Sequence, residues 1–176
     1  MRNVVLIGFM GTGKTSVGKM LATRLGFSFV DLDQYIEEKE GRSIPSIFRE
    51  QGEAAFRAME HEAVLENAER RNTVIATGGG TVKDASNMDA LHRSGAIVCL
   101  KADVDTILAR TAREGERPVL DKEDQGDRRQ AVENLLEARK DLYTVADFSV
   151  NTAEMSPLQV VDTIVQQLKR RGALHG

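Results

Sequence analysis

A glycine-rich loop close to the start of the chain constrains the fold more than any other feature of the sequence. Residues Gly8–Thr15 read GFMGTGKT and fit the pattern G-x-x-x-x-G-K-[ST]. The loop follows the apolar run Asn3–Ile7 and precedes Lys14–Leu25, whose apolar residues recur every three or four positions, as in an amphipathic helix. Because this motif joins a strand to a helix where it binds phosphate, its context predicts an α/β fold with a nucleotide site.

The residue types in this loop suit a nucleoside triphosphate, either ATP or GTP. Glycines let backbone N–H groups converge on phosphate oxygens, and the start of the following helix adds its positive partial charge. We expect Lys14 to reach the β- and γ-phosphates and the Thr15 hydroxyl to bind Mg²⁺. Gly11, Thr12, Gly13 and Ser16 complete the expected nucleotide contacts. The alternative is a glycine-rich turn that binds nothing.

The rest of the chain alternates short apolar runs with longer stretches of helical period, which is typical of βαβ units and a mostly parallel sheet. The sequence therefore predicts an α/β protein with a five-stranded parallel sheet flanked by helices. The predicted strands are Asn3–Ile7, Ser28–Leu32, Thr73–Ala76, Ala96–Leu100 and Phe148–Asn151. The predicted helices are Lys14–Leu25 and residues 34–40, 53–70, 84–93, 103–113, 128–145 and 157–171.

Two segments do not fit a plain alternation of strands and helices. The stretch Gly41–Arg71 is too long for a simple crossover, because it adds Pro45 and Phe48 before a second long helix. We interpret residues from about 33 to 71 as a substrate-binding insertion. Residues from about 112 to 127 are rich in charge and glycine and lack apolar period, which is typical of a functional lid and also of an idle surface loop. No linker or repeat divides residues 1–176, so we expect one domain.

Composition and charge exclude several classes of protein. The 176 residues carry a formal net charge of -3, which disfavours a dedicated nucleic-acid binder. The lone Cys99 cannot form an internal disulfide, so we expect a cytoplasmic protein and an inert core thiol. The sequence has no signal peptide and no run of 18 apolar residues, so we expect no membrane attachment. His61, His92 and His175 show no metal spacing, and we assign them surface or packing roles.

Two carboxylates follow the second predicted strand. Asp31 and Asp33 stand at its carboxyl end, which is the edge where ligands bind in open α/β sheets. The alternative is that Asp33 caps the helix starting near Gln34 and that Asp31 holds a turn. The strand Thr73–Ala76 ends in glycines and not in the usual metal-supporting acid. We therefore expect Asp31 to support Mg²⁺ and Asp33 to orient or deprotonate a substrate hydroxyl.

Four further short patterns are candidates for a binding site. Arg57 and Glu60 lie one helical turn apart, although such a pair is often only a solvated surface ion pair. Three consecutive glycines at a strand end permit close approach of a ligand, or they form a tight turn with no ligand. These patterns are Phe56-Arg57-x-x-Glu60, Gly78-Gly79-Gly80, Arg117-Pro118-Val119-Leu120 and Arg139-x-x-x-Tyr143.

Taken in order along the chain, these motifs resemble shikimate kinase, a family of small P-loop kinases of the nucleoside-monophosphate-kinase-like class. The resemblance runs from the Gly8–Thr15 loop through Asp31-x-Asp33 to Arg139-x-x-x-Tyr143 and so covers nearly the whole chain. It implies ATP-dependent phosphorylation of the 3-hydroxyl of shikimate, giving shikimate 3-phosphate and ADP, in chorismate and aromatic amino-acid biosynthesis. It also implies a P-loop kinase fold with a substrate-binding subdomain and a lid, Mg²⁺ as cofactor, and ATP and shikimate as ligands.

The resemblance further implies a role for each matching residue. Shikimate is held by Asp33, Arg57, Gly79, Gly80 and Arg139, with the two arginines on its carboxylate and Asp33 at its hydroxyls. Planar guanidinium groups suit such a carboxylate, because they can form two parallel hydrogen bonds with it. Glu60 then orients Arg57.

For the phosphoryl donor, the resemblance implies that Lys14 and Arg117 act in catalysis beside Asp33, and that Arg117 arrives from the closing lid. It also implies that Arg110 stacks on adenine and that the Asn151–Pro157 turn, including Pro157, closes around the base. An ordinary surface arginine and an ordinary turn remain the alternatives at these two places. Val119, and Thr12 with Thr15-Ser16 in the loop, depart from the common family residues without touching a charged role.

Two other functions share part of this pattern. A kinase for another small polyol acid, such as gluconate, would have the same loop and fold class, whereas the paired arginines with Asp33 favour a cyclic acid. A nucleotide-switched binding module would need a guanine-reading N-K-x-D segment, which the sequence lacks. No predicted helix shows a spare apolar face, so we expect a monomer.

Overall fold

The computed structural model describes residues 2–9, 12–114 and 125–173, with side chains left out at 112–114 and 125–127. All strands found in these residues form one parallel sheet. Its strands are β1 (Asn3–Gly8), β2 (Ser28–Asp31), β3 (Thr73–Ala76), β4 (Gly95–Lys101) and β5 (Phe148–Asn151), in the spatial order β2-β3-β1-β4-β5. The helices are α1 (Lys14–Leu25), α2 (Leu32–Glu40), α3 (Ile44–Gln51), α4 (Glu53–Ala68), α5 (Ala85–Ser94), α6 (Val104–Glu114), α7 (Gln125–Arg139) and α8 (Pro157–Arg170), with the 3₁₀ turns η1 (Thr81–Lys83) and η2 (Leu142–Val145).

The central strand β1 is buried along its whole length. Leu6, for example, aligns with Ala76 of β3 on one side and with Val98 of β4 on the other. Parallel strands covered on both faces are expected to be continuously apolar, and β1 carries such a run from Val4 to Ile7. The predicted fold class is therefore confirmed, and the five predicted strands all form within one or two residues of their predicted bounds.

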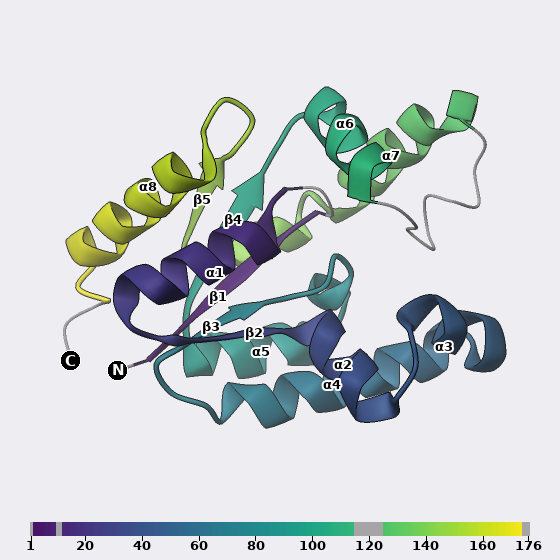
Figure 1. The fold of residues 1–176 in the computed structure, drawn as a ribbon, viewed down its shortest axis with the longest axis horizontal. Helices are drawn as coiled ribbons and strands as arrows, with labels where there is room; N and C mark the ends of the chain where they lie inside the picture. The colour runs from purple at the N-terminus through teal and green to yellow at the C-terminus, as the bar shows by residue number, and fades with distance from the viewer. Residues whose placement is uncertain (1, 10–11, 115–124, 174–176) are drawn as a thin grey trace.

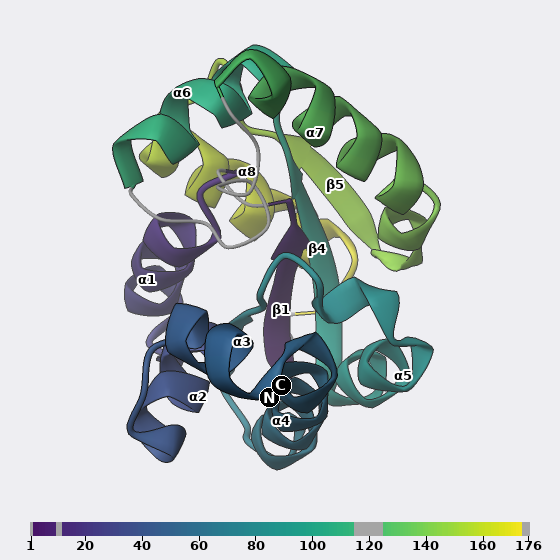
Figure 2. The same cartoon turned by 90° about the vertical axis from the view of Figure 1, so that its right-hand side faces the viewer.

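Helices cover both faces of the sheet (Figures 1 and 2). On one face α1 and α8 pack together against β1, β3, β4 and β5, with Leu21 and Ile164 fully buried there. On the other face the core is built by α4, α5, α6 and α7, with Val64, Leu91 and Ile107 fully buried. This three-layer arrangement leaves the carboxyl ends of the strands open to ligands.

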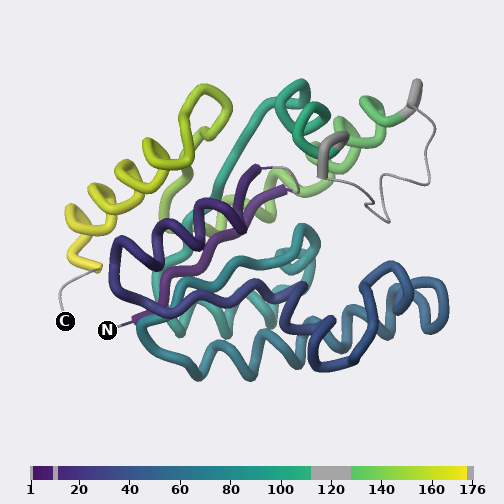
Figure 3. Tube along the Cα trace, in the orientation of Figure 1, coloured from purple at the N-terminus to yellow at the C-terminus, as the bar shows by residue number. Residues whose placement is uncertain are grey.

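Two peripheral parts of the chain extend past the carboxyl edge of the sheet (Figures 1 and 3). One consists of α2 and α3, which pack on α4 and share a small core of their own around Ile36, Ile47 and Phe56. The other consists of α6 and α7, which pack on each other. The sheet edge, with the loop after β1, lies between them. In the described part of the chain no helix is both long and apolar enough to span a membrane.

The structure corrects three boundaries of the sequence prediction. The segment around Pro45 forms α3, because Ser43 caps it and proline fits the first turn of a helix. Leu32 opens α2 and does not end β2, because the Asp31 carboxylate accepts the Gln34 N–H as the helix cap. The predicted helix 128–145 is broken after Arg139, where the tighter turn η2 takes over and buries Tyr143.

Candidate active site

The glycine-rich loop occupies the carboxyl end of β1, as its motif predicts. Gly13 caps α1 with a φ of 93°, and Gly8 has a φ of 146°. A Cβ atom on Gly8 would lie 2.4 Å from the Leu100 carbonyl oxygen, so only glycine fits there. No side chain caps the start of α1. Its first N–H groups are thus available to an anion, as a phosphate site requires. Gly11 lies outside the described residues.

The Lys14 side chain is folded back over this loop. Its ammonium donates to the carbonyl oxygens of Gly8 at 2.6 Å and of Phe9 at 2.9 Å, and the residue is 9% exposed. Thr12 is buried as well, with its hydroxyl donating to the Phe9 carbonyl. The loop therefore encloses a positive charge that its own dipoles hold in place.

Thr15 and Asp31 are joined directly. The Thr15 hydroxyl donates to the second Asp31 carboxylate oxygen at 2.6 Å, while the first oxygen accepts from the Gln34 backbone. Asp31 thus performs the capping role and also stands behind the loop hydroxyl. Hydroxyl and carboxylate oxygens are ligands that Mg²⁺ prefers, so these two residues fit the ion. Among the described residues no cluster of three or more His, Cys, Asp or Glu side chains could hold a metal by itself.

Asp33 lies in the first turn of α2 and faces the glycine turn after β3. A Cβ on Gly78 would come within 2.6 Å of an Asp33 carboxylate oxygen, so glycine at this position makes room for the carboxylate. Burial raises the pKa of Asp33 to about 7, and the negative charges of Asp31 and Glu60 add to this effect, against the opposing charge of Lys14. A carboxylate with such a pKa titrates near neutral pH and can exchange a proton there.

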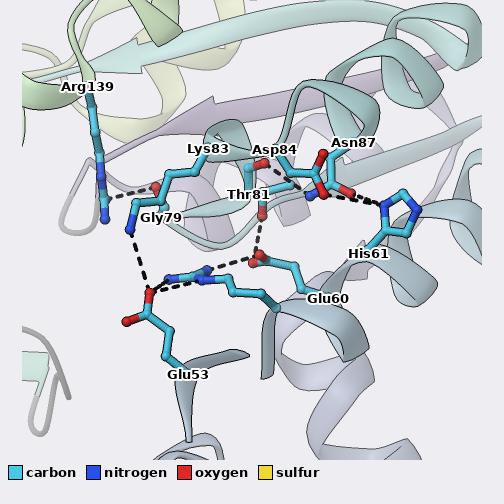
Figure 4. A network of polar contacts seen from close by, with 10 residues as sticks. Glu53, Glu60, His61, Gly79, Thr81, Lys83, Asp84, Asn87 and Arg139 are labelled. Atoms are coloured by element: carbon cyan, nitrogen blue, oxygen red, sulfur yellow. Dashed lines mark hydrogen bonds and ion pairs between the residues drawn. The ribbon is translucent and has the colours of Figure 1, made fainter. Parts of the chain in front are cut away.

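The same glycine turn brings two arginines to the site. A Cβ on Gly80 would lie 2.5 Å from the Arg57 guanidinium, and the Gly79 carbonyl accepts a 3.0 Å hydrogen bond from Arg139 (Figure 4). None of the three glycines has a positive φ, and at Gly78 and Gly80 the missing side chain makes space for the Asp33 carboxylate and the Arg57 guanidinium. Asp33 of α2, Arg57 of α4 and Arg139 of α7 therefore meet around one short backbone segment.

The ion pair between Arg57 and Glu60 is not a solvated surface contact. The Glu60 side chain is 2% exposed, and one of its oxygens accepts from Arg57 at 3.0 Å. Arg57 also lies 3.4 Å from the exposed Glu53 carboxylate. A buried carboxylate of this kind fixes the orientation of the guanidinium, because leaving either charge unpaired in the interior is costly.

Arg139 is the clearest sign of an anionic ligand. It is 2% exposed, its Nε has no hydrogen-bond partner, and no carboxylate of the described residues lies within ion-pair distance. Its guanidinium lies over the Phe9 ring, 5.5 Å from the centroid. Burial raises the pKa of the neighbouring Tyr143 to about 12, so this phenol cannot neutralise the arginine. A buried unpaired cation is unfavourable unless a ligand completes it.

Arg110 is joined to the turn between β5 and α8. It donates to the Thr152 hydroxyl at 3.1 Å and to the Thr152 carbonyl at 3.2 Å. The same hydroxyl lies 3.0 Å from the Lys101 carbonyl oxygen and 3.3 Å from that of Thr12 in the loop, and either can accept its one hydrogen. Pro157 opens α8 behind a complete capping box at Ser156. Arg110 and the turn thus flank the phosphate loop. Ser16 is exposed near the start of α1.

Arg117 and most of the predicted lid lie outside the described residues, so the structure does not place them. The sequence analysis missed four residues that the structure brings into or beside the site. Thr152 links the loop to Arg110, and a hydrogen-bonded series connects Glu60 to Thr81, Asn87 and His61. Of these residues only Thr81 has a signal in the sequence, because it directly follows the triple glycine. His61, for which a surface or packing role was predicted, is partly exposed and lies 2.7 Å from the Asn87 side-chain oxygen.

Comparison with known proteins identifies close relatives of this arrangement. Residues 10–169 match the family model described as shikimate kinase. A shikimate kinase of Persephonella marina is 41% identical over 169 residues, covering 96% of this chain and all of that protein. One from Thermus thermophilus is 44% identical over 174 residues, covering 98% of this chain and 93% of that protein.

Solved structures agree with the sequence comparison. Shikimate kinase from Acinetobacter baumannii in complex with shikimate superposes with a TM-score of 0.91 at 37% identity, covering 97% of this chain and 94% of that one. Shikimate kinase from Aquifex aeolicus gives a TM-score of 0.80 at 35% identity, with 99% of each chain covered.

Proposed function

The chain belongs to the shikimate kinase family, and from this membership we propose that it transfers the γ-phosphoryl group of ATP to the 3-hydroxyl of shikimate. The products are shikimate 3-phosphate and ADP. The protein is accordingly a kinase, a transferase of the shikimate pathway.

One observation carries this proposal. Two guanidinium groups, from Arg57 and Arg139, and one carboxylate, from Asp33, converge on the three glycines after β3. The substrate must therefore be small, with an anionic group for the arginines and a hydroxyl for the aspartate. Shikimate has a carboxylate on one side of its ring and hydroxyls on the other. The shikimate bound in the Acinetobacter baumannii structure supports this assignment.

In the proposed complex the arginines act on the carboxylate. The Nε of Arg139 has no partner and supplies a donor at the edge of its guanidinium. The guanidinium of Arg57 lies beside Gly80. Gly79 and Gly80 contribute backbone beside the ring. Because the two guanidiniums come from different helices, the carboxylate is held from two directions, which fixes the orientation of the hydroxyls toward Asp33.

Asp33 is proposed to orient the 3-hydroxyl and to accept its proton. With a pKa of about 7, it is ionised in a large fraction of molecules at neutral pH and is basic enough to take the proton as transfer proceeds. Phosphoryl transfer through a loose transition state needs little base strength, so orientation is the larger part of this role.

The phosphate loop is proposed to hold the donor. Lys14 would leave the Gly8 and Phe9 carbonyls for the β- and γ-phosphates, and the backbone N–H groups of Gly11, Thr12 and Gly13 would bind phosphate oxygens beside Ser16. Thr15, backed by Asp31, would hold Mg²⁺, which when bound neutralises charge on the phosphates.

Further parts of the proposal rest on the sequence pattern. Arg110 and the turn ending at Pro157 would enclose the base, and Arg117 would approach the transferring phosphoryl from a lid at about 112–127. Residues from about 33 to 71 would form the substrate-binding insertion of a single domain. The sequence pattern predicts no helix with a spare apolar face, which supports a monomer, and the composition supports a cytoplasmic enzyme.

The experiment that tests this function is a panel of acceptors. ADP release is followed with Mg-ATP and shikimate, gluconate or buffer alone, and again with GTP in place of ATP. We expect shikimate to stimulate ADP release at least about a hundredfold over buffer, because hydrogen bonds to charged groups contribute about 1.5–3 kcal/mol each. Stimulation by gluconate and not by shikimate would assign the site to an acyclic polyol acid, and no stimulation by either would refute a kinase of this class.

A further inference from the structure

A series of hydrogen bonds runs from the candidate substrate site back into the protein (Figure 4). Arg57 donates to one oxygen of Glu60, and the hydroxyl of Thr81 donates to the other, each at 3.0 Å. The side-chain amide of Asn87 donates to the Thr81 carbonyl at 3.2 Å, and its oxygen lies 2.7 Å from His61 Nδ1. The series therefore joins α4, the turn η1 and α5.

The direction of each hydrogen bond in this series is fixed by its neighbours. Because the Thr81 carbonyl can only accept, the Asn87 NH₂ group must face it, and the Asn87 oxygen must face His61. The Ser86 hydroxyl donates to Asp84, so it too offers an acceptor to the imidazole, as does the Asp84 carboxylate at 3.7 Å. His61 Nδ1 therefore carries a hydrogen and donates it. Asn87 has no freedom to rotate, and the Thr81 backbone is held in one position.

Glu60 depends on Thr81 for half of its hydrogen bonding. Glu60 is 2% exposed and Thr81 is fully buried, so water cannot replace the hydroxyl. Without it, one oxygen of a buried carboxylate would lose its donor, and the group would gain by rotating to take a second N–H from Arg57. That N–H is one that lies against Gly80 in the present arrangement. The Thr81 hydroxyl thus keeps the Glu60 carboxylate shared between two donors.

We propose that Thr81 is a positioning residue for substrate binding: its hydroxyl holds Glu60 so that the outer edge of the Arg57 guanidinium is placed for the substrate carboxylate. In this structure that edge donates at 3.4 Å to the exposed Glu53 carboxylate, which the substrate carboxylate would replace. The proposal rests on the proposed function, because it assumes that Arg57 binds the substrate anion. Thr81 itself need not touch the substrate.

The test compares two substitutions of nearly equal shape. Thr81→Val removes the hydroxyl and keeps the branched side chain, whereas Thr81→Ser keeps the hydroxyl. We expect Thr81→Val to raise the KM and Kd for shikimate about tenfold or more, the effect expected for a lost hydrogen bond to a charged group, and to leave the KM for ATP unchanged. For Thr81→Ser, the KM values for shikimate and ATP are expected to stay within about threefold of those of the parent. If the side chain only filled space, the serine variant would be affected more than the valine variant.

A matched control is Thr73→Val at the opposite end of β3. Thr73 is also buried, but its hydroxyl donates to the Arg71 carbonyl and not to a carboxylate. It is expected to cost stability without changing the KM for shikimate. Thr81→Ala is measured alongside, so that a folding failure of the valine variant leaves the comparison with Thr81→Ser intact. Equal losses for shikimate in Thr73→Val and Thr81→Val would overturn the proposal.

A double-mutant cycle with Glu60→Gln asks whether Thr81 acts through Glu60. If it does, Thr81→Val will cost about tenfold in shikimate affinity in the parent but less than about threefold in the Glu60→Gln background, because the buried charge is then already gone. The same loss in both backgrounds would overturn the proposal. Calorimetric binding of shikimate to the parent distinguishes a failure of the proposed function from a failure of the proposed role of Thr81. If the parent does not bind shikimate, the proposed function itself is contradicted.

Discussion

Replacing Asp33 by asparagine should stabilise the folded protein at alkaline pH while it abolishes turnover. Asp33 carries a pKa of about 7 against an ordinary value of 3.8, because burial and the charges of Asp31 and Glu60 oppose its ionisation. Between these two values the folded state binds a proton that the unfolded state has lost. Stability therefore falls as the pH rises from about 4 to about 7, and the asparagine variant escapes this loss.

The expected change in the free energy of unfolding depends on the pH range over which it is measured. Between pH 5 and pH 7 the unfolded carboxyl is ionised and the folded one is not, so two pH units at about 1.4 kcal/mol each give roughly 3 kcal/mol. Asp33 keeps partial contact with solvent, which we take to halve this figure to about 1.5 kcal/mol. For a chain of this length that corresponds to about 3–6 °C in Tm.

The assay is urea unfolding of the parent and of Asp33→Asn at pH 5 and pH 8 without ligands. The free energy of unfolding of the variant, minus that of the parent, should be about 1.5 kcal/mol more favourable at pH 8 than at pH 5. Asp89→Asn, at an exposed position on α5, is the matched control and should show no such change. A difference for Asp33→Asn that does not depend on pH would contradict a raised pKa of Asp33. ATP binding should survive in this variant.

Three further substitutions test the other charged groups. Arg139→Met should weaken shikimate binding about a hundredfold in calorimetry without lowering Tm, because it removes a buried cation whose Nε is unpaired; a lower Tm with intact binding would contradict this. Gly80→Ala should raise the KM for shikimate about tenfold and also lower the free energy of unfolding in urea, because the added Cβ displaces the Arg57 guanidinium from the buried Glu60 carboxylate; an unchanged KM would contradict it. Arg117→Ala should lower kcat by about 10²–10³ with shikimate affinity within about threefold, since a lid charge acts mainly in the transition state; equal losses would remove that role.

The sheet could be predicted from the sequence because each strand is a short apolar run bounded by polar residues. A short apolar run such as that of β1, followed by a pattern of helical period, predicts a strand that is buried on both faces. The helix α3 could not be predicted in the same way. Only eight residues long, it is defined by its cap at Ser43 and by the packing of Ile47 on α2 and α4, which are tertiary features.

The site was predictable where charge and glycine coincide in the sequence, and not where its support is made of ordinary residues. Charged residues and glycines in the fold cost free energy unless a ligand or a partner compensates them, and this marks the phosphate loop, Asp33, Arg57 and Arg139. Thr81, by contrast, has no residue type that marks a site, and its role depends on a carboxylate 21 positions earlier that the fold brings to it. Local sequence cannot show which polar side chain completes a buried charge.

The dual role of Asp31 illustrates a second limit of sequence reasoning. Holding a turn and supporting Mg²⁺ were the alternatives predicted for Asp31, and capping was the alternative predicted for Asp33. In the structure Asp31 is the cap of α2 through one carboxylate oxygen, and its other oxygen accepts from the Thr15 hydroxyl. The structure resolves the question, because it shows which donor each carboxylate oxygen of Asp31 accepts from.

The most direct test of the account is the position of the transferred phosphate. The protein is incubated with Mg-ATP and shikimate, and the product is examined by ³¹P–¹H correlation spectroscopy. With the carboxylate held by Arg57 and Arg139 and the hydroxyls facing Asp33, the account predicts a single phosphate ester coupled to the proton at carbon 3. An ester at another hydroxyl would contradict the proposed orientation, and ADP formed with inorganic phosphate alone would contradict the proposed reaction.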